Sequence, residues 1–453
     1  MGLVKRQRLD FTEGNVWQLL IRFTIPLLIG DVFQQIYTLT DTIVVGRFVG
    51  KEALAAVGST SATTNTIIGM FLGISVGASV VISQYYGSKD IENLSRAIHT
   101  TTTITLMLSV AFTVAGVMLT PALLRLMSTP EDVYDTALLY LRIYFAGISG
   151  LVIYNMGGGI LRAIGDSQRP SYALVISTVI NIALDLLLVC VFRWGVAGAA
   201  YATVAAQFGS AAYLLWCLNR CPKPYALRIK RLKLDRAIAG RVLLLGIPIG
   251  LQRMITAFSN VIVQSYINFF GSDCMAGWSA YSKVHSLAIL PLENIGTAIV
   301  SYVGQNYGAK KYERIIQGVR TAWALNTLVT GTIVVAICIF TEPLIRLFNT
   351  DPSVVAYGVQ FLRMLAPLFL ISTINRTYAG AVRGLGDGTG PMIIMLFSYV
   401  LTRQAYLKIG TQFFNTPTFV AFGYSAGWLM ASVLILVYYT IRKRRLLKHA
   451  QTE

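Results

Sequence analysis

Charged side chains are scarce in this sequence, and their scarcity limits what the protein can be. Only 13% of the 453 residues are charged and 55% are hydrophobic, with a mean hydropathy of +0.61. A soluble globular chain carries about 25% charged residues. The apolar residues also fall in blocks of about 20, the length that crosses a bilayer core as a helix. The composition therefore predicts an integral membrane protein.

Short segments of alternating polar and apolar residues are missing as well, which excludes a transmembrane β-barrel. Because lipid offers the backbone no hydrogen-bond partner, each apolar block must be a helix. We expect an all-α polytopic membrane protein whose basic and then apolar N-terminus is a retained first span, not a cleaved signal peptide. The twelve expected transmembrane helices are 16–41, 54–82, 97–120, 136–157, 170–192, 195–218, 240–268, 275–303, 317–340, 354–380, 391–413 and 418–441.

Residues for catalysis and metal binding are few. The five cysteines lack the paired spacing of a disulfide framework or a metal site, and there are only three histidines. The sequence contains no Walker motif, nucleophile elbow or His-Glu-x-x-His zinc signature. The glycine-rich stretch 384–390 is read as a tight turn, because no strand precedes it. We therefore expect neither an enzyme nor a bound cofactor.

The net charge of +18 comes largely from lysines and arginines at the ends of the apolar blocks. A nucleic-acid-binding protein would need a basic face on a soluble domain, for which this chain has no room. An even number of spans puts both termini on one side, and the positive-inside rule makes that side cytoplasmic. We expect a multi-pass protein of the cytoplasmic (inner) membrane. Its outer loops then hold only Arg47, Lys51, Arg125, Arg193, Arg346 and Lys408.

An internal repeat is the most informative pattern in the chain. Matching segments recur at an offset of 221 residues, or 222 near the start of each half: Ile25-Pro26 with Ile247-Pro248, Gln84–Gly87 with Gln305–Gly308, Thr120–Thr129 with Thr341–Thr350, and the Arg-x-x-Gly-Asp turns at 162–166 and 383–387. Six spans per copy give two parallel halves, with a substrate path expected between them. The expected parts are an N-terminal tail 1–15, an N-lobe 16–218, a basic linker 219–239, a C-lobe 240–441 and a basic tail 442–453.

A charge inside a membrane-spanning helix needs a partner, a wet cavity or a function. Asp41 lies near the outer end of the first span, Asp185 about 22 Å along the fifth, and Thr203 about 12 Å below the outer surface in the sixth. Asn181 shares a helix face with Asp185. Neither carboxylate has an acidic counterpart in the second half. These oxygens suit a small cation such as Na⁺ or a proton shared between the carboxylates, but a polar clamp between helices is an equal alternative.

A single carboxylate, Glu293, lies near the middle of the eighth span, and its repeat equivalent is Leu72. It is a candidate for binding a cationic substrate, as are His285 and Gln34. The alternative is an internal salt bridge between Glu293 and Lys283 or Arg253, which the pattern slightly favours.

Several of these patterns together resemble the multidrug and toxic compound extrusion (MATE) transporters. They are the span end at 39–46, the Gln-x-Tyr-Gly segments, the Arg-x-x-Gly-Asp turns, Asn181-x-x-x-Asp185 and Gly195–Thr203. The resemblance implies a two-lobed antiporter that exports small cationic or amphipathic organic compounds against inward H⁺ or Na⁺. It also implies a coupling-cation site at Asp41, Asn181, Asp185 and Thr203, with no other metal.

Two questions stay open at this point. A lipid-linked oligosaccharide flippase of the same superfamily shares the two-lobed plan, although such proteins tend to have a cationic cavity and extra helices. The sequence also leaves open the coupling ion, the physiological substrate and the oligomeric state, although we expect a monomer among membrane lipids.

The expected orientation can be tested with cysteine labelling. A cysteine placed at Asp273, in an outer loop, should react with an impermeant reagent applied to intact cells, whereas one at Lys230, in the linker, should not. Both are introduced into a variant that lacks the five native cysteines. Labelling at position 230 in intact cells would contradict the orientation.

Overall fold

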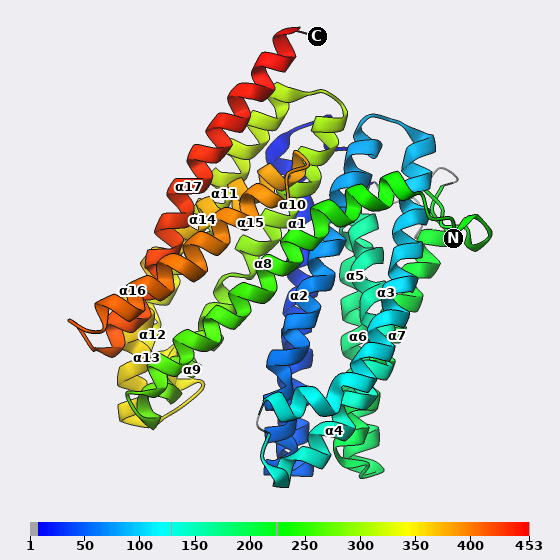
Figure 1. Ribbon diagram of the computed structural model, residues 1–453. Helices are drawn as coiled ribbons and strands as arrows, with labels where there is room; N and C mark the ends of the chain where they lie inside the picture. The colour runs from blue at the N-terminus through cyan, green and yellow to red at the C-terminus, as the bar shows by residue number, and fades with distance from the viewer. Residues whose placement is uncertain (1–7, 128, 223–224, 453) are drawn as a thin grey trace. The chain divides into compact units, whose positions relative to one another are not determined.

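The computed structural model describes residues 8–127, 129–222 and 225–452, and within these ranges all regular structure is helical (Figure 1). Small parts of the expected tails and linker, residues 1–7, 223–224 and 453, lie outside the described residues. By its internal contacts the chain divides into two units. Unit 1 contains Met1–Asp10 and Ile25–Ile247, and unit 2 contains Phe11–Thr24 and Pro248–Glu453.

The division between the units falls within two helices, beside a proline in each. Helix α1 contains Pro26 and helix α8 contains Pro248. Proline removes one backbone hydrogen bond from a helix and crowds the preceding turn. The division therefore differs from the expected lobe limits at 218 and 240, because the first turns of α1 belong to unit 2 and the first turns of α8 belong to unit 1.

The helices of the first half, with two π-helical turns and one 3-10 turn, follow one another in this order: α1 (Val16–Val44), η1 (Val45–Val49), α2 (Lys51–Gly87), α3 (Ile91–Leu126), α4 (Glu131–Ala146), α5 (Ile148–Ala163), α6 (Gln168–Asp185), η2 (Leu186–Val191), α7 (Gly195–Asn219) and η3 (Ile229–Arg231). Those of the second half are α8 (Arg236–Asn268), α9 (Ser272–Ala288), α10 (Leu290–Gly308), α11 (Tyr312–Ile339), α12 (Thr341–Arg346), α13 (Pro352–Leu365), η4 (Ala366–Leu368), α14 (Phe369–Gly384), α15 (Thr389–Leu396), η5 (Phe397–Thr402), α16 (Arg403–Gly410) and α17 (Pro417–Thr452).

Each of the twelve expected spans corresponds to a helical segment. Within the described residues, nine helices are long and apolar enough to cross a membrane, or ten if the bent pair α4–α5 counts as one span. That pair bends by 46° at Gly147, which the sequence analysis did not foresee. Two of the twelve expected spans are not among these ten: 195–218, which is formed by α7, and 391–413, which contains α15 and α16.

Close helix packing in unit 1 depends on small residues. A Cβ atom on Gly77 of α2 would lie 2.6 Å from the backbone nitrogen of Gly246 in α8, so only glycine allows this approach. Helices α5, α6 and α7 also pack against one another, and Figure 1 shows them running side by side. Small residues permit this contact because lipid provides no hydrophobic force to hold helices together.

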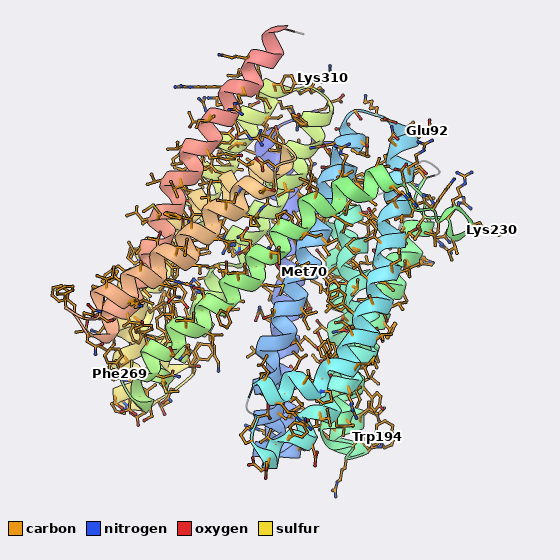
Figure 2. The ribbon with its side chains drawn as sticks, viewed as in Figure 1. Met70, Glu92, Trp194, Lys230, Phe269 and Lys310 are labelled. Carbon is orange, nitrogen blue, oxygen red and sulfur yellow. The ribbon has the colours of Figure 1, made fainter. Side chains whose placement is uncertain are left out.

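The loops expected on opposite sides of the membrane lie at opposite ends of each unit (Figure 2). In unit 1, Glu92 and Lys230 lie toward one end and Trp194 at the other. In unit 2, Lys310 and Phe269 are similarly separated. In each unit, the loops expected on the two sides of the membrane are therefore separated by the length of the helices.

The segment before α1, residues 8–14, is held by both parts of the chain. In unit 1 the amide of Leu9 donates to the carbonyl of Gly165 at 3.1 Å, and the Arg8 guanidinium lies 4.7 Å from the Tyr225 ring centre. In unit 2 the amide of Phe11 donates to Gln305 Oε1 at 3.0 Å. The fully buried Phe11 ring also packs against Phe23 and Tyr302.

Arg314 of α11 makes three hydrogen bonds to the part of this segment that belongs to unit 2. Its guanidinium donates to the carbonyls of Phe11 at 3.0 Å, and of Glu13 and Gly14 at 2.8 Å each. Hydrogen bonds that involve charged groups are worth about 1.5–3 kcal/mol each, and less where they are exposed to solvent, as the bonds to Glu13 and Gly14 are. We therefore name residues 8–14 the N-terminal strap and regard Arg314 as its principal anchor.

The strap gives a prediction for hydrogen exchange. Arg314→Gln should increase the exchange rate of the backbone amides of residues 9–14 about tenfold, which corresponds to about 1.4 kcal/mol of local opening. Arg320→Gln is the matched control, because Arg320 is exposed on the same helix. Equal exchange in both variants, measured by mass spectrometry, would show that the strap does not depend on Arg314.

Candidate functional site

Three helices of unit 1 bring the predicted coupling residues together. Asp41 comes from α1, Asn181 and Asp185 from the last turns of α6, and Thr203 from α7. The Asp41 carboxylate is close enough to Asp185 to interact with it electrostatically. The depth estimate from the sequence therefore grouped residues that are neighbours in space.

Tyr37 joins this group, although the sequence analysis did not select it. Its hydroxyl donates to Thr203 Oγ1 at 3.2 Å, and it also interacts electrostatically with both Asp41 and Asp185. The sequence could have indicated Tyr37, because it lies four residues before Asp41 and therefore on the same helix face.

These side chains are deeply buried. The exposed fraction is 0% for Asn181 and Asp185, 2% for Thr203 and 8% for Asp41. Tyr140, on α4 and also buried, interacts electrostatically with Asp41. Two carboxylates thus lie in an enclosed environment where an uncompensated charge is costly.

Thr203 has a hydrogen-bond partner in Tyr37, but polar atoms of both acids and of Asn181 have none among the described residues. Within the part of the chain that the structure describes, both Asp185 oxygens, both Asn181 side-chain polar atoms and Asp41 Oδ1 form no hydrogen bond. Asn181 lies near Asp185, but their geometry does not meet hydrogen-bond criteria. Buried polar groups in native proteins are nearly always satisfied, so unsatisfied ones need an explanation. In a polar clamp between helices these groups would be hydrogen-bonded to one another. Here neither Asp185 oxygen nor Asp41 Oδ1 accepts a hydrogen bond from a described residue.

The local backbone is irregular beside both acids. The π-helical turn η2 starts directly after Asp185, and η1 starts four residues after Asp41. Such turns insert an extra residue into a helix and occur often at functional sites. The donor set is made of carboxylate, amide and hydroxyl oxygens, which suit a hard cation or a proton.

The predicted substrate candidates are placed differently. Glu293 of α10 forms an ion pair with Arg376 of α14, so it has a salt-bridge partner, but not Lys283 or Arg253 as the sequence suggested. The Lys283 ammonium lies 5.4 Å from the Phe348 ring centre instead. Depth along a helix predicts which residues share a level in the membrane, but not which helices are adjacent.

The remaining two candidates, His285 and Gln34, form no ion pair with any described residue. The His285 ring lies among aromatic rings, 4.9 Å from that of Phe369 and 6.0 Å from that of Trp428. Gln34 is partly exposed on α1, and its backbone carbonyl accepts a hydrogen bond from the Thr38 hydroxyl.

Unit 2 also buries a guanidinium, that of Arg403, at 3% exposure. It donates to Ser259 Oγ at 2.5 Å and Asn260 Oδ1 at 2.9 Å, and it lies 4.8 Å from the Tyr424 ring centre. Its partners are therefore neutral oxygens and an aromatic face, not a carboxylate.

Comparison with known proteins places this geometry in context. The family model described as MatE matches residues 26–187 and 248–404. The probable multidrug resistance protein YpnP of Bacillus subtilis is 30% identical over 97% of this chain and 98% of its own length. An FAD transporter of Shewanella oneidensis is 24% identical over 90% of each chain. A solved structure of an outward-facing MATE family transporter of the MOP superfamily matches with a TM-score of 0.91 and 24% identity, covering 98% of this chain and 99% of that one.

The unsatisfied oxygens give a prediction for stability. Asp185→Leu should leave the free energy of unfolding within about 1 kcal/mol of the original or raise it, because a buried acid without partners contributes no hydrogen bonds. The matched control is Asn375→Leu. The Asn375 amide group bonds to the Tyr399 hydroxyl, the Trp428 carbonyl and the Ser432 hydroxyl.

Asn375→Leu should cost about 2–4 kcal/mol, because it leaves several buried groups unpaired. Thermal unfolding in detergent, followed by tryptophan fluorescence, measures both variants. A loss for Asp185→Leu as large as that for Asn375→Leu would indicate a structural clamp.

Proposed function

Because the chain belongs to the multidrug and toxic compound extrusion family, we propose that it is a secondary active antiporter in which inward H⁺ or Na⁺ drives the export of amphipathic organic compounds. The family match makes the protein a multi-pass membrane transporter rather than an enzyme. We further propose that it works as a monomer in the cytoplasmic (inner) membrane, with both termini in the cytoplasm.

The observation that supports this proposal is the buried acid pair without hydrogen-bond partners in unit 1. Asp41 and Asp185 provide the charge, and Asn181, Thr203 and Tyr37 provide neutral oxygens around it. A proton or a sodium ion is the ligand that such a group of oxygens suits. Without it, two carboxylates repel each other in a low-dielectric environment.

Coupling follows from this repulsion. A bound cation stabilises the arrangement in which both carboxylates are close together, and its release favours an arrangement in which they are separated or hydrated. An ion shifts a conformational equilibrium only by its difference in affinity for the two states. A shift from 1:99 to 99:1 requires a difference of about 5.5 kcal/mol, which the pairing and unpairing of two buried charges is large enough to provide.

The substrate class is a separate question. Cationic compounds were expected on account of Glu293, but this carboxylate is already paired with Arg376. Relatives include proteins named for multidrug resistance and one named an FAD transporter, so amphipathic compounds are the class that we propose. The flippase alternative is not favoured, because the MatE model matches most of the chain and the Bacillus subtilis relative is named for multidrug resistance.

The coupling proposal gives a transport prediction. Asp41→Asn and Asp185→Asn should each be expressed normally but abolish gradient-driven export, measured as dye uptake into inverted vesicles. Either variant retains one carboxylate, which no longer discriminates between the two conformations. Asp135→Asn is the matched control, because Asp135 is an exposed acid on α4 of the same unit.

The same vesicles identify the ion. Dissipating the pH gradient or the sodium gradient separately, with a selective ionophore, should stop export in only one case. Full export by either Asp41→Asn or Asp185→Asn would place the coupling site elsewhere in the protein.

A further inference from the structure

The two halves of the repeat differ in charge at one matched position. Asp31 lies five residues after Pro26, and Arg253 lies five residues after Pro248, at the same offset of 222 as the prolines. Arg162 and Arg383 match at 221. In unit 1, Asp31 and Arg162 interact electrostatically, so the pair is balanced. In unit 2 the two matched positions are both arginines, Arg253 and Arg383.

A third arginine adds to this group. Arg376 and Arg383 are seven residues apart on α14, which puts them on one face of that helix. Arg253 on α8 interacts electrostatically with Arg376, and Arg383 interacts with both. Arg253, Arg376 and Arg383 are named the arginine cluster below, and all belong to unit 2.

Glu293 is the one acid recorded as interacting with the cluster among the described residues. It forms its ion pair with Arg376 and interacts electrostatically with Arg253 and Arg383. Three guanidinium groups and one carboxylate leave two positive charges in excess.

The other two arginines have little to offset their charge. Arg383 donates to the neutral Gln252 Oε1 at 2.7 Å, and its Nε has no hydrogen-bond partner within the described part of the chain. Arg253 forms no recorded hydrogen bond or ion pair with any described residue. Donors of this kind remain available to a ligand.

This excess lies within helices that cross the membrane and is accessible from outside the fold. The exposed fraction of the side chain is 37% for Arg376 and 33% for Glu293, and Arg253 and Arg383 are also partly exposed. Charges in membrane-spanning segments are costly, and those that persist mark substrate or ion pathways. A structural role would predict a balanced pair, as in unit 1.

We propose that the arginine cluster binds the carboxylate or phosphate group of an anionic amphipathic molecule. Guanidinium groups bind both anions through paired, parallel hydrogen bonds. Aromatic side chains lie beside the cluster: Tyr399 interacts electrostatically with Arg376, as does His285, whose ring is packed near Phe369 and Trp428. An aromatic body attached to the anionic group fits these surroundings.

Glu293 has a defined part in this binding. It occupies Arg376 and lowers the positive charge of the cluster, but it does not cancel it. Arg253 and Arg383 remain for the anion. Removal of the Glu293 charge therefore strengthens anion binding, which is the opposite of what a cation-attracting Glu293 would produce.

Binding of carboxyfluorescein, an aromatic carboxylate, to the purified full chain tests the proposal by fluorescence polarisation. We expect Arg253→Gln to weaken binding about tenfold and Glu293→Gln to strengthen it severalfold. Arg320→Gln, which removes an exposed arginine of unit 2, should leave binding unchanged. Ethidium, an aromatic cation of similar size, should bind more weakly than carboxyfluorescein to the unaltered protein.

Two results would overturn the proposal. One is equal carboxyfluorescein binding by Arg253→Gln and the unaltered protein, and the other is a loss of ethidium binding in Glu293→Gln without a gain for carboxyfluorescein. If Arg253→Gln does not fold, Arg253→Lys keeps the charge but loses the paired hydrogen bonds. It should still weaken binding by a measurable factor, and unchanged binding would equally overturn the proposal.

The anionic group can belong to a lipid or to a dissolved compound. Binding is therefore repeated in nanodiscs of phosphatidylcholine with and without phosphatidylglycerol. Competition by phosphatidylglycerol that disappears in Arg253→Gln assigns the group to a lipid, and binding without competition assigns it to a solute.

The inference that the bound anion is a transported substrate rests on the proposed antiport. The measurement of anion binding to the purified protein does not depend on transport. Absence of gradient-driven export with arginine-dependent binding intact would refute the antiport alone. Export that proceeds while carboxyfluorescein binding ignores the arginines would refute the anion site alone.

Discussion

A charged side chain inside a membrane-spanning helix loses most of its water, and this constraint determines how nearly every ionisable residue of the protein is arranged. Asp31 faces Arg162, and Glu293 faces Arg376. The buried Arg403 guanidinium is surrounded by hydroxyl and amide oxygens and an aromatic ring. Because such compensation is the rule, the places where it fails are informative. They are the acid pair of unit 1 and the arginine cluster of unit 2.

The internal repeat makes these two places comparable. Asn181 and Ile182 match Thr402 and Arg403, Tyr37 matches Ser259, and Thr203 matches Tyr424. In unit 2 the matched residues Ser259, Arg403 and Tyr424 are in contact, so a guanidinium fixed to the chain lies in the region where unit 1 places its unsatisfied acids. A permanent cation cannot be released. This difference is the reason why we propose that the driving ion binds in unit 1 and that unit 2 serves the substrate.

Much of the fold was predictable because the bilayer restricts the chain so strongly. Length and hydropathy predicted the helical segments, and the constant offset predicted the repeat. The similar depth of Asp41, Asn181, Asp185 and Thr203 in the membrane followed from helix rise alone. Tyr37 was missed although its spacing from Asp41 was visible. The Arg376 partner of Glu293 was not predictable, since rise gives depth and not which helices are neighbours. The bend at Gly147 and the π-helical turns depend on local packing that no periodicity encodes.

The Gln-x-Tyr-Gly segments show why a repeat keeps a motif that carries no charge of its own. In unit 1, Gln84 Oε1 accepts a hydrogen bond from Arg241 at 3.1 Å, at the start of α8. In unit 2, Gln305 Oε1 accepts from the Phe11 amide at 3.0 Å, just before α1. The first motif therefore contacts the start of α8, and the second contacts the segment that leads into α1; each of these helices continues into the other unit. An amide side chain suits this task, because its carbonyl oxygen accepts equally from a guanidinium and from a backbone amide. The duplicated motif therefore makes the same kind of contact twice, with different donors.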